Sequence, residues 1–184
     1  MFAMRLFTLV VGTLIIVWVS RSSLRSVQSH GFYRFFAWEL ILILFVLNVN
    51  NWIVNPLSLK QIIAWSFLLL SVVLIYLGVR SFRQSGNINQ NRVDPTLVGI
   101  EKTTELVSNG VYRYIRHPFY SSLLFLAWGI FFKYPTWIGI VLASIITILL
   151  IITAQKEEIE NIAFFGDKYQ DYMAGTKMFI PFIL

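Results

Sequence analysis

Residues 106–122 read LVSNGVYRYIRHPFYSS and hold the densest polar chemistry of the chain. An apolar run follows them directly. Pro118 disfavours helix at the residue before it and is well placed at the first position of a new helix. We therefore expect His117 to be extended and to lead into a helix N-terminus, where unpaired backbone N–H groups favour a bound anion.

The composition is that of a membrane protein. The 184 residues are 57% hydrophobic and 13% charged, and a soluble domain of this size has too little interior to cover so much apolar surface. With no cysteine, disulfides, thiolate nucleophiles and cysteine-ligated metals are excluded. The two histidines, His30 and His117, are far apart, which argues against a histidine metal site.

Five apolar segments predict an all-α integral membrane protein that forms one domain over residues 1–184. A cleaved signal peptide is the alternative for the first segment, but no small-x-small cleavage pattern follows it. We assign no role to Glu39 in the second segment or to His30 in the loop before it. The predicted spans are residues 6–20, 35–54, 57–79, 119–134 and 136–154.

The basic residues predict the topology. Five crossings place residues 20–34, residues 80–116 and the tail after residue 155 on one side, with twelve of the fifteen Lys and Arg residues. By the positive-inside rule this side is cytoplasmic, so the N-terminus is outside and the C-terminus inside. The net charge of +6 thus follows from topology, and we expect no nucleic-acid partner.

A second polar cluster, Glu157, Glu158 and Glu160, lies at the foot of the last predicted span. Acids at a helix C-terminus oppose the helix dipole, so at least one of them should have a cationic partner. Arg113, Arg116 and a bound ligand are the candidates. The tail beyond has an apolar side, as expected of a helix lying in the membrane interface.

The two clusters together carry a family resemblance. The pattern GVYRYIRHPFY, an apolar helix, KEE, FGDKYQDYM and a closing IP resembles the isoprenylcysteine carboxyl methyltransferase and phospholipid methyltransferase family of integral membrane enzymes. The matching segments are 106–132 and 156–181. In that family such segments enclose the cofactor S-adenosylmethionine at the cytosolic surface. The cofactor becomes S-adenosylhomocysteine when it gives up its methyl group, and the lipid substrate enters from the bilayer. Asn161 departs from the pattern, because an apolar residue usually stands there.

The resemblance implies cofactor-binding segments at 106–122 and 156–181. The chemistry of the acceptor gives three candidate catalytic residues, Arg113, Arg116 and Glu157: either arginine would hold a carboxylate, whereas an amine needs a base, which would be Glu157 or its neighbour Glu158. Methyl transfer itself needs alignment and exclusion of water more than a nucleophilic side chain. The implied cofactor residues are Leu106, Val107, Gly110, Tyr112, Arg116, His117, Pro118, Tyr120, Glu157 and Glu158.

Several functions remain open at this point. The expected acceptor is lipid-like, either the carboxylate of a prenylated cysteine or a similar small hydrophobic molecule. The alternatives are a phospholipid amine N-methyltransferase, an NADPH-dependent membrane reductase and a non-catalytic lipid-binding protein. The arginines and glutamates would also be explained by an interfacial salt-bridge network without a ligand. No metal partner is expected.

Overall fold

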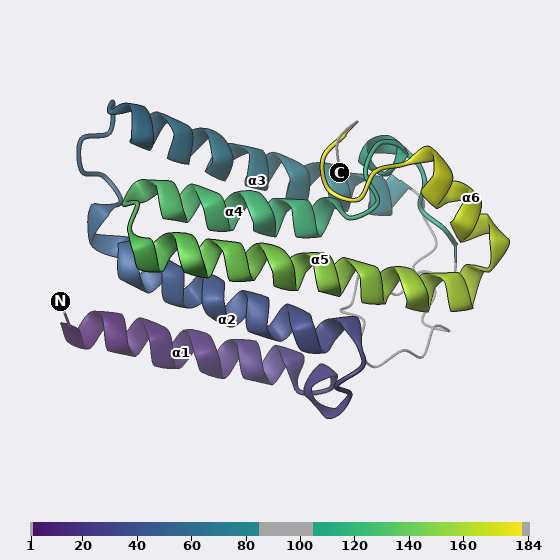
Figure 1. Cartoon of the computed structure of the whole chain (residues 1–184), viewed down its shortest axis with the longest axis horizontal. Helices are drawn as coiled ribbons and strands as arrows, with labels where there is room; N and C mark the ends of the chain where they lie inside the picture. The colour runs from purple at the N-terminus through teal and green to yellow at the C-terminus, as the bar shows by residue number, and fades with distance from the viewer. Residues whose placement is uncertain (1, 85–104, 182–184) are drawn as a thin grey trace.

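The computed structural model describes residues 2–84 and 105–181, which form helices joined by short turns (Figure 1). Within this part of the chain there is no β-strand longer than one bridge. The α-helices are α1 (Phe2–Ser20), α2 (His30–Asn48), α3 (Leu59–Gln84), α4 (Pro118–Lys133), α5 (Trp137–Phe165) and α6 (Asp167–Gly175), and the 3₁₀ turns are η1 (Ser23–Arg25), η2 (Val49–Asn51) and η4 (Gly110–Arg113).

All five predicted apolar helices are present, and four of them are long and apolar enough to cross a membrane: α1, α2 with η2, α3 and α5. The fifth, α4, has 16 residues, or about 24 Å at 1.5 Å per residue. This is less than the roughly 30 Å hydrocarbon core. The chain is therefore an all-helical, multi-pass membrane protein.

The helix boundaries differ from the predicted ones at polar residues. Helix α2 begins at His30 rather than at residue 35, because buried contacts hold its polar first turn in place. Helix α5 continues past residue 154 to Phe165 and ends where Gly166 adopts a φ of 62°. This left-handed backbone favours glycine, and α6 starts directly after it.

Small side chains lie where the helices pack. Helix α3 packs on α4, α2 packs on α5, and α1 packs on α2. Ala37, Ala127, Ala143 and Ala154 are fully buried at these contacts, and small residues let membrane helices approach closely. Helices α1, α2, α3 and α5 direct large apolar side chains outward, which suits contact with lipid, whereas no residue of α4 is exposed.

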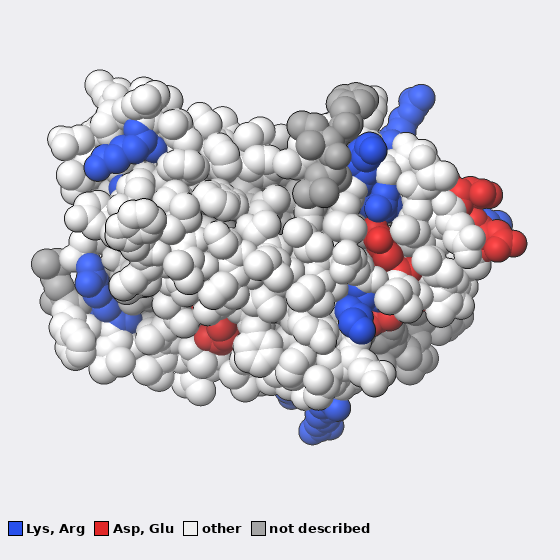
Figure 2. Space-filling model, in the orientation of Figure 1, with Lys and Arg blue, Asp and Glu red and all other residues white. Residues whose placement is uncertain are grey.

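The chain ends and turns sort into two groups along the bundle (Figure 1). The α2–α3 and α4–α5 turns lie at one end with the start of α1. The α1–α2 turn and α6 lie at the other. Lys, Arg, Asp and Glu side chains gather toward both ends, with few between them (Figure 2). The described parts of the segments that we expected on one side of the membrane, residues 20–34, 80–84, 105–116 and 156–181, lie toward one end of the bundle.

Lys133 lies at the end of the bundle that holds the α2–α3 and α4–α5 turns. It is fully buried, its Nζ donates to Gln61 Oε1 at 2.9 Å, and it lies 3.2 Å from the centroid of the Trp65 ring. A cation over an indole face is attracted by the ring quadrupole. This contact fastens the end of α4 to α3.

Candidate functional site

Backbone hydrogen bonds from the C-terminal tail hold the RHP motif in place. Arg116 N donates to Lys177 O at 2.7 Å, His117 N donates to Met178 O at 3.1 Å, and Lys177 N donates to Tyr114 O at 3.1 Å. Pro118 lacks an N–H and begins α4 immediately afterwards. The predicted helix start at Pro118 is confirmed. His117 is non-helical, as predicted, but its φ of −123° and ψ of 62° lie outside the extended region that we expected.

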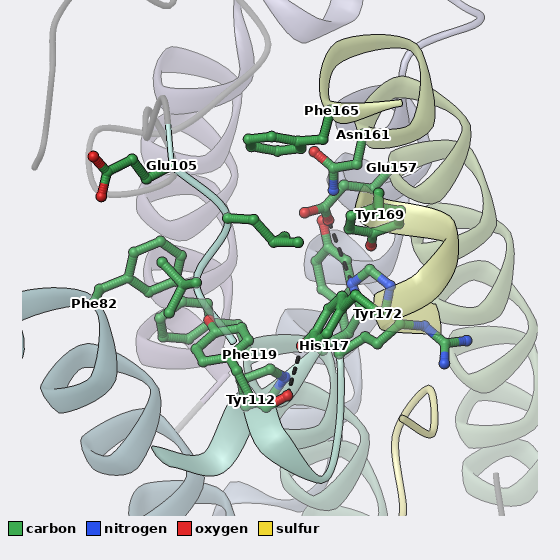
Figure 3. A pocket seen from close by; sticks show the side chains of 15 residues that line it. Phe82, Glu105, Tyr112, His117, Phe119, Glu157, Asn161, Phe165, Tyr169 and Tyr172 are labelled. Atoms are coloured by element: carbon green, nitrogen blue, oxygen red, sulfur yellow. Dashed lines mark hydrogen bonds and ion pairs between the residues drawn. The ribbon is translucent and has the colours of Figure 1, made fainter. Parts of the chain in front are cut away.

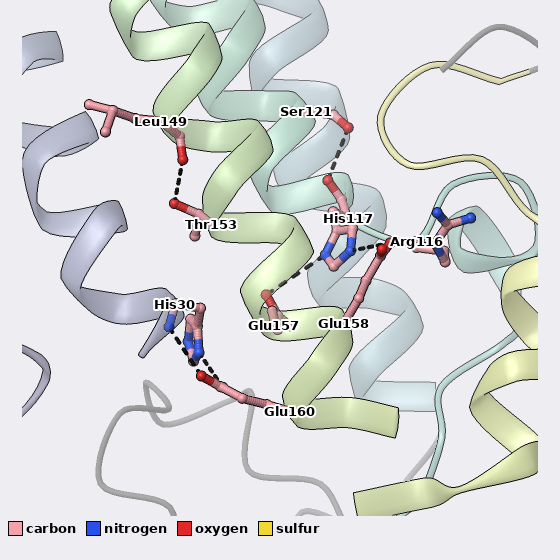
Figure 4. Close-up of polar contacts among 9 residues, drawn as sticks. All are labelled: His30, Arg116, His117, Ser121, Leu149, Thr153, Glu157, Glu158 and Glu160. Atoms are coloured by element: carbon pink, nitrogen blue, oxygen red, sulfur yellow. Dashed lines mark hydrogen bonds and ion pairs between the residues drawn. The ribbon is translucent and has the colours of Figure 1, made fainter. Parts of the chain in front are cut away.

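Glu158 is the centre of a buried polar network (Figure 4). Its Oε1 accepts from Arg116 Nε at 2.7 Å and lies 3.2 Å from His117 Nε2. On the other side of the ring, His117 Nδ1 is 3.7 Å from Glu157 Oε2. Arg116 also donates to the carbonyl oxygens of Met173 and Thr176. The expected cationic partner of the acids is therefore Arg116.

A pocket that is open to the surface lies beside this network (Figure 3). Side chains of α3, α4, α5, α6 and the segment before α4 form its walls. Eight of the ten expected cofactor residues line it: Leu106, Val107, Tyr112, Arg116, His117, Pro118, Tyr120 and Glu157.

The other two expected residues lie outside the pocket wall and support it. Glu158 is 7% exposed and faces Arg116 and His117. Gly110 has a φ of 57°, and a Cβ at this position would lie 2.2 Å from Ser81 Oγ. Glycine is thus required both for the backbone conformation and for the close approach of η4 to α3.

The pocket also contains residues that the sequence reasoning did not assign. Asn161 and Phe165 follow Glu157 at intervals of four, so they share its helix face. This spacing is a signal that was available from the sequence. Phe82 carried no such signal, because its place beside the motif depends on how α3 packs against α4 and η4. The unassigned residues are Phe82, Glu105, Phe119, Asn161, Phe165, Tyr169 and Tyr172.

The two tyrosines of α6 close one side of the pocket. Burial raises the pKa of Tyr169 and of Tyr172 above its ordinary value, so both hydroxyls stay protonated at neutral pH. Tyr172 Oη donates to Tyr112 O at 2.7 Å, and Tyr169 hydrogen-bonds Asn161. These bonds tie α6 to η4 and to α5.

Two further residues differ from their expected surroundings. Arg113 is exposed and lines a separate cleft between η4 and α3, so it does not join Arg116 and Glu157. His30, to which we gave no role, is fully buried. Its Nδ1 lies 2.5 Å from Glu160 Oε2, and its backbone N–H donates to Glu160 Oε1 at 3.1 Å. This pair connects α2 to α5 beneath the pocket.

Comparisons with known proteins give the family. A family model described as phospholipid methyltransferase matches residues 59–167, more than half of the chain. A methanethiol S-methyltransferase of Crocosphaera subtropica is 36% identical over 72 residues, which cover 39% of this chain and 28% of that protein. No solved structure matches. With its matched region containing the RHP motif, Glu157 and Glu158, the chain belongs to the phospholipid methyltransferase family of membrane proteins.

Proposed function

We propose that this chain transfers a methyl group from S-adenosylmethionine to a lipid-like or small hydrophobic acceptor. One observation carries the proposal: eight residues expected for the cofactor, from segments about 40 residues apart, line one pocket. The family membership favours methyl transfer over the reductase alternative.

The residues of the pocket suit the chemical groups of this cofactor. Phe82, Phe119 and Phe165 offer aromatic faces for a purine ring. Glu157 offers an acceptor for ribose hydroxyls, and tyrosine faces stabilise positive charge. When bound, S-adenosylmethionine supplies a methyl group on a positively charged sulfur. The protein's part is to align the two reactants and to exclude water.

A carboxylate acceptor, such as that of a prenylated cysteine, would be held by Arg116. The guanidinium group is already oriented by Glu158 and by two backbone carbonyls. The Nη2 group forms none of these bonds and is the donor that a substrate carboxylate would use. A carboxylate attacks without losing a proton, so this acceptor requires no base.

A thiol or amine acceptor is the second candidate, and Glu157 is the observation that favours it. Its carboxylate lines the pocket with its side chain 19% exposed, in reach of an S–H or N–H proton. A small thiol also fits the relative named methanethiol S-methyltransferase. Arg116 would then serve only to shape the site, and Glu157 would receive the proton.

The membrane topology proposed with this function has five crossings, N-out and C-in, and a pocket that faces the cytoplasm. The α4–α5 turn lies at the end of the bundle opposite α6 (Figure 1), which is the arrangement that a crossing by α4 requires. Twelve of the fifteen basic residues belong to segments assigned to the pocket end. The acceptor would enter from the bilayer between helices.

The test begins with calorimetric titration of the detergent-purified protein by S-adenosylhomocysteine, with NADPH in parallel. Micromolar binding of S-adenosylhomocysteine alone is expected, and His117→Ala should weaken it. Asp171→Asn, which removes an exposed acid of α6, should leave it unchanged. Binding of NADPH alone would refute the proposal in favour of the reductase.

The acceptor class is then assigned with methyl-labelled S-adenosylmethionine and three acceptors: a prenylated cysteine, phosphatidylethanolamine and a small alkyl thiol. Transfer to the first with activity retained in Glu157→Gln supports the carboxylate mechanism. Transfer to the thiol or the amine, lost in Glu157→Gln, supports the base mechanism. Cofactor binding without transfer to any of them would support the non-catalytic lipid-binding alternative.

A further inference from the structure

The 3₁₀ turn η4 separates two concave surfaces. Tyr112 lines the cofactor pocket, whereas Val111 and Arg113 line a cleft on the other side of η4. The last turns of α3 form the opposite wall of this cleft. Because Gly110 has no Cβ, the two walls can approach each other closely at Ser81. The cleft is thus a built feature of the fold and is distinct from the cofactor pocket.

The cleft is positively charged. Arg80 from α3 and Arg113 from η4 both line it, and both are exposed. Among the described residues that line the cleft there is no acid, and within residues 2–84 and 105–181 neither arginine forms an ion pair. Two guanidinium groups beside one cleft suit a phosphate, which accepts several charge-assisted hydrogen bonds.

Exposed apolar side chains on the outer face of α3 lie in line with this cleft. Leu69, Val73 and Tyr76 are 65%, 40% and 62% exposed. They lie on one helix face with Arg80, at intervals of three and four residues. On a membrane helix such exposed apolar side chains contact acyl chains, while tyrosine and arginine lie at the headgroup level. Leu69, Val73 and Tyr76 therefore form an apolar track along α3 that ends at the two arginines of the cleft.

The geometry points to a binding site for an anionic phospholipid. Its phosphate lies between Arg80 and Arg113, and one acyl chain runs along Tyr76, Val73 and Leu69. The charge complementarity and the continuous apolar track both favour a lipid over a soluble phosphate. The site does not depend on methyl transfer, since the lipid bound here need not carry a nucleophile.

The test is native mass spectrometry of the delipidated protein titrated with phosphatidylglycerol, which carries a phosphate but no amine. The variants are Arg80→Ala, Arg113→Ala and the double variant. Arg83→Ala is the matched control, because Arg83 is exposed in the last turn of α3 and does not line the cleft. Each cleft arginine should change the affinity by about fivefold, and Arg83 by less than twofold.

Equal losses in Arg83→Ala and the cleft variants would overturn the inference, because they would indicate general attraction to a basic surface. Displacement of the lipid by inorganic phosphate at equal concentration would assign the cleft to a soluble anion instead. Phosphatidylglycerol with a photoreactive acyl chain provides a second measurement on the unaltered protein. It should label α3 between Leu69 and Tyr76, and labelling confined to other helices would also refute the site.

Discussion

Replacing Glu158 by glutamine removes the charge that holds Arg116 and His117 together. Glu158 is 7% exposed, and its Oε1 lies 2.7 Å from Arg116 Nε and 3.2 Å from His117 Nε2. Breaking a buried ion pair costs about 3–5 kcal/mol. We take the lower end, about 3 kcal/mol, because glutamine keeps one acceptor oxygen and Arg116 keeps its carbonyl partners. For a chain of this length the melting temperature should fall by about 6–12 °C.

The assay is thermal unfolding in detergent, with and without S-adenosylhomocysteine, with Asp171→Asn as the control for loss of one acid. Because Glu158 supports two residues of the pocket wall, the ligand affinity of Glu158→Gln should fall about tenfold or more, as expected for a misplaced charged hydrogen bond. A melting temperature within 2 °C of the control would refute the structural role. Reduced stability with unchanged affinity would show that Arg116 and His117 do not contact the ligand.

Three other substitutions test separate parts of the site. Glu157→Gln should keep the melting temperature within about 2 °C and lower thiol or amine methylation at least a hundredfold, as expected for loss of a general base; retained activity would exclude Glu157 as the base. Gly110→Ala should lower the free energy of unfolding by about 1–2 kcal/mol because of the left-handed backbone, and further because its Cβ clashes with Ser81. Adding Ser81→Ala to this variant should therefore restore only part of the lost melting temperature. His30→Ala should lower the free energy of unfolding by about 2 kcal/mol, because Glu160 loses the buried side chain that it pairs with. The affinity for S-adenosylhomocysteine should change less than threefold, and a larger loss would place His30 in the ligand site.

Local signals in the sequence were sufficient for the helices and for most of the pocket wall. Pro118 acts on its own residue and on the one before it, so the non-helical backbone of His117 and the start of α4 were both predictable. A run of apolar residues is likewise a signal within one segment, so the apolar helices were predictable. The resemblance, which rests on short motifs, identified Tyr112, Tyr120 and Glu157 as lining residues.

The choice between Arg113 and Arg116 was not predictable in this way. A spacing of three places two residues on one face of a continuous helix, which would have made them neighbours. The chain instead ends its 3₁₀ turn at Arg113 and becomes extended at Ile115, which pairs with Lys177. This change of backbone conformation sends the two arginines to different surfaces.

The pair of His30 and Glu160 was missed for a different reason. The two residues are 130 positions apart, and no periodicity within either segment specifies that α2 packs against α5. His30 also belongs to a polar stretch next to an apolar run, which is the ordinary composition of a membrane interface. Only the packing of the two helices shows that it is buried.

The pairing of residues 114–117 with 177–179 has a consequence for biosynthesis. Every apolar helix of the chain is translated before residue 177, so all membrane insertion signals are complete before the last backbone partners of the RHP motif leave the ribosome. A product that stops short of Lys177 would therefore insert normally and still lack an assembled cofactor pocket. Such a truncation separates membrane targeting from cofactor binding within a single chain.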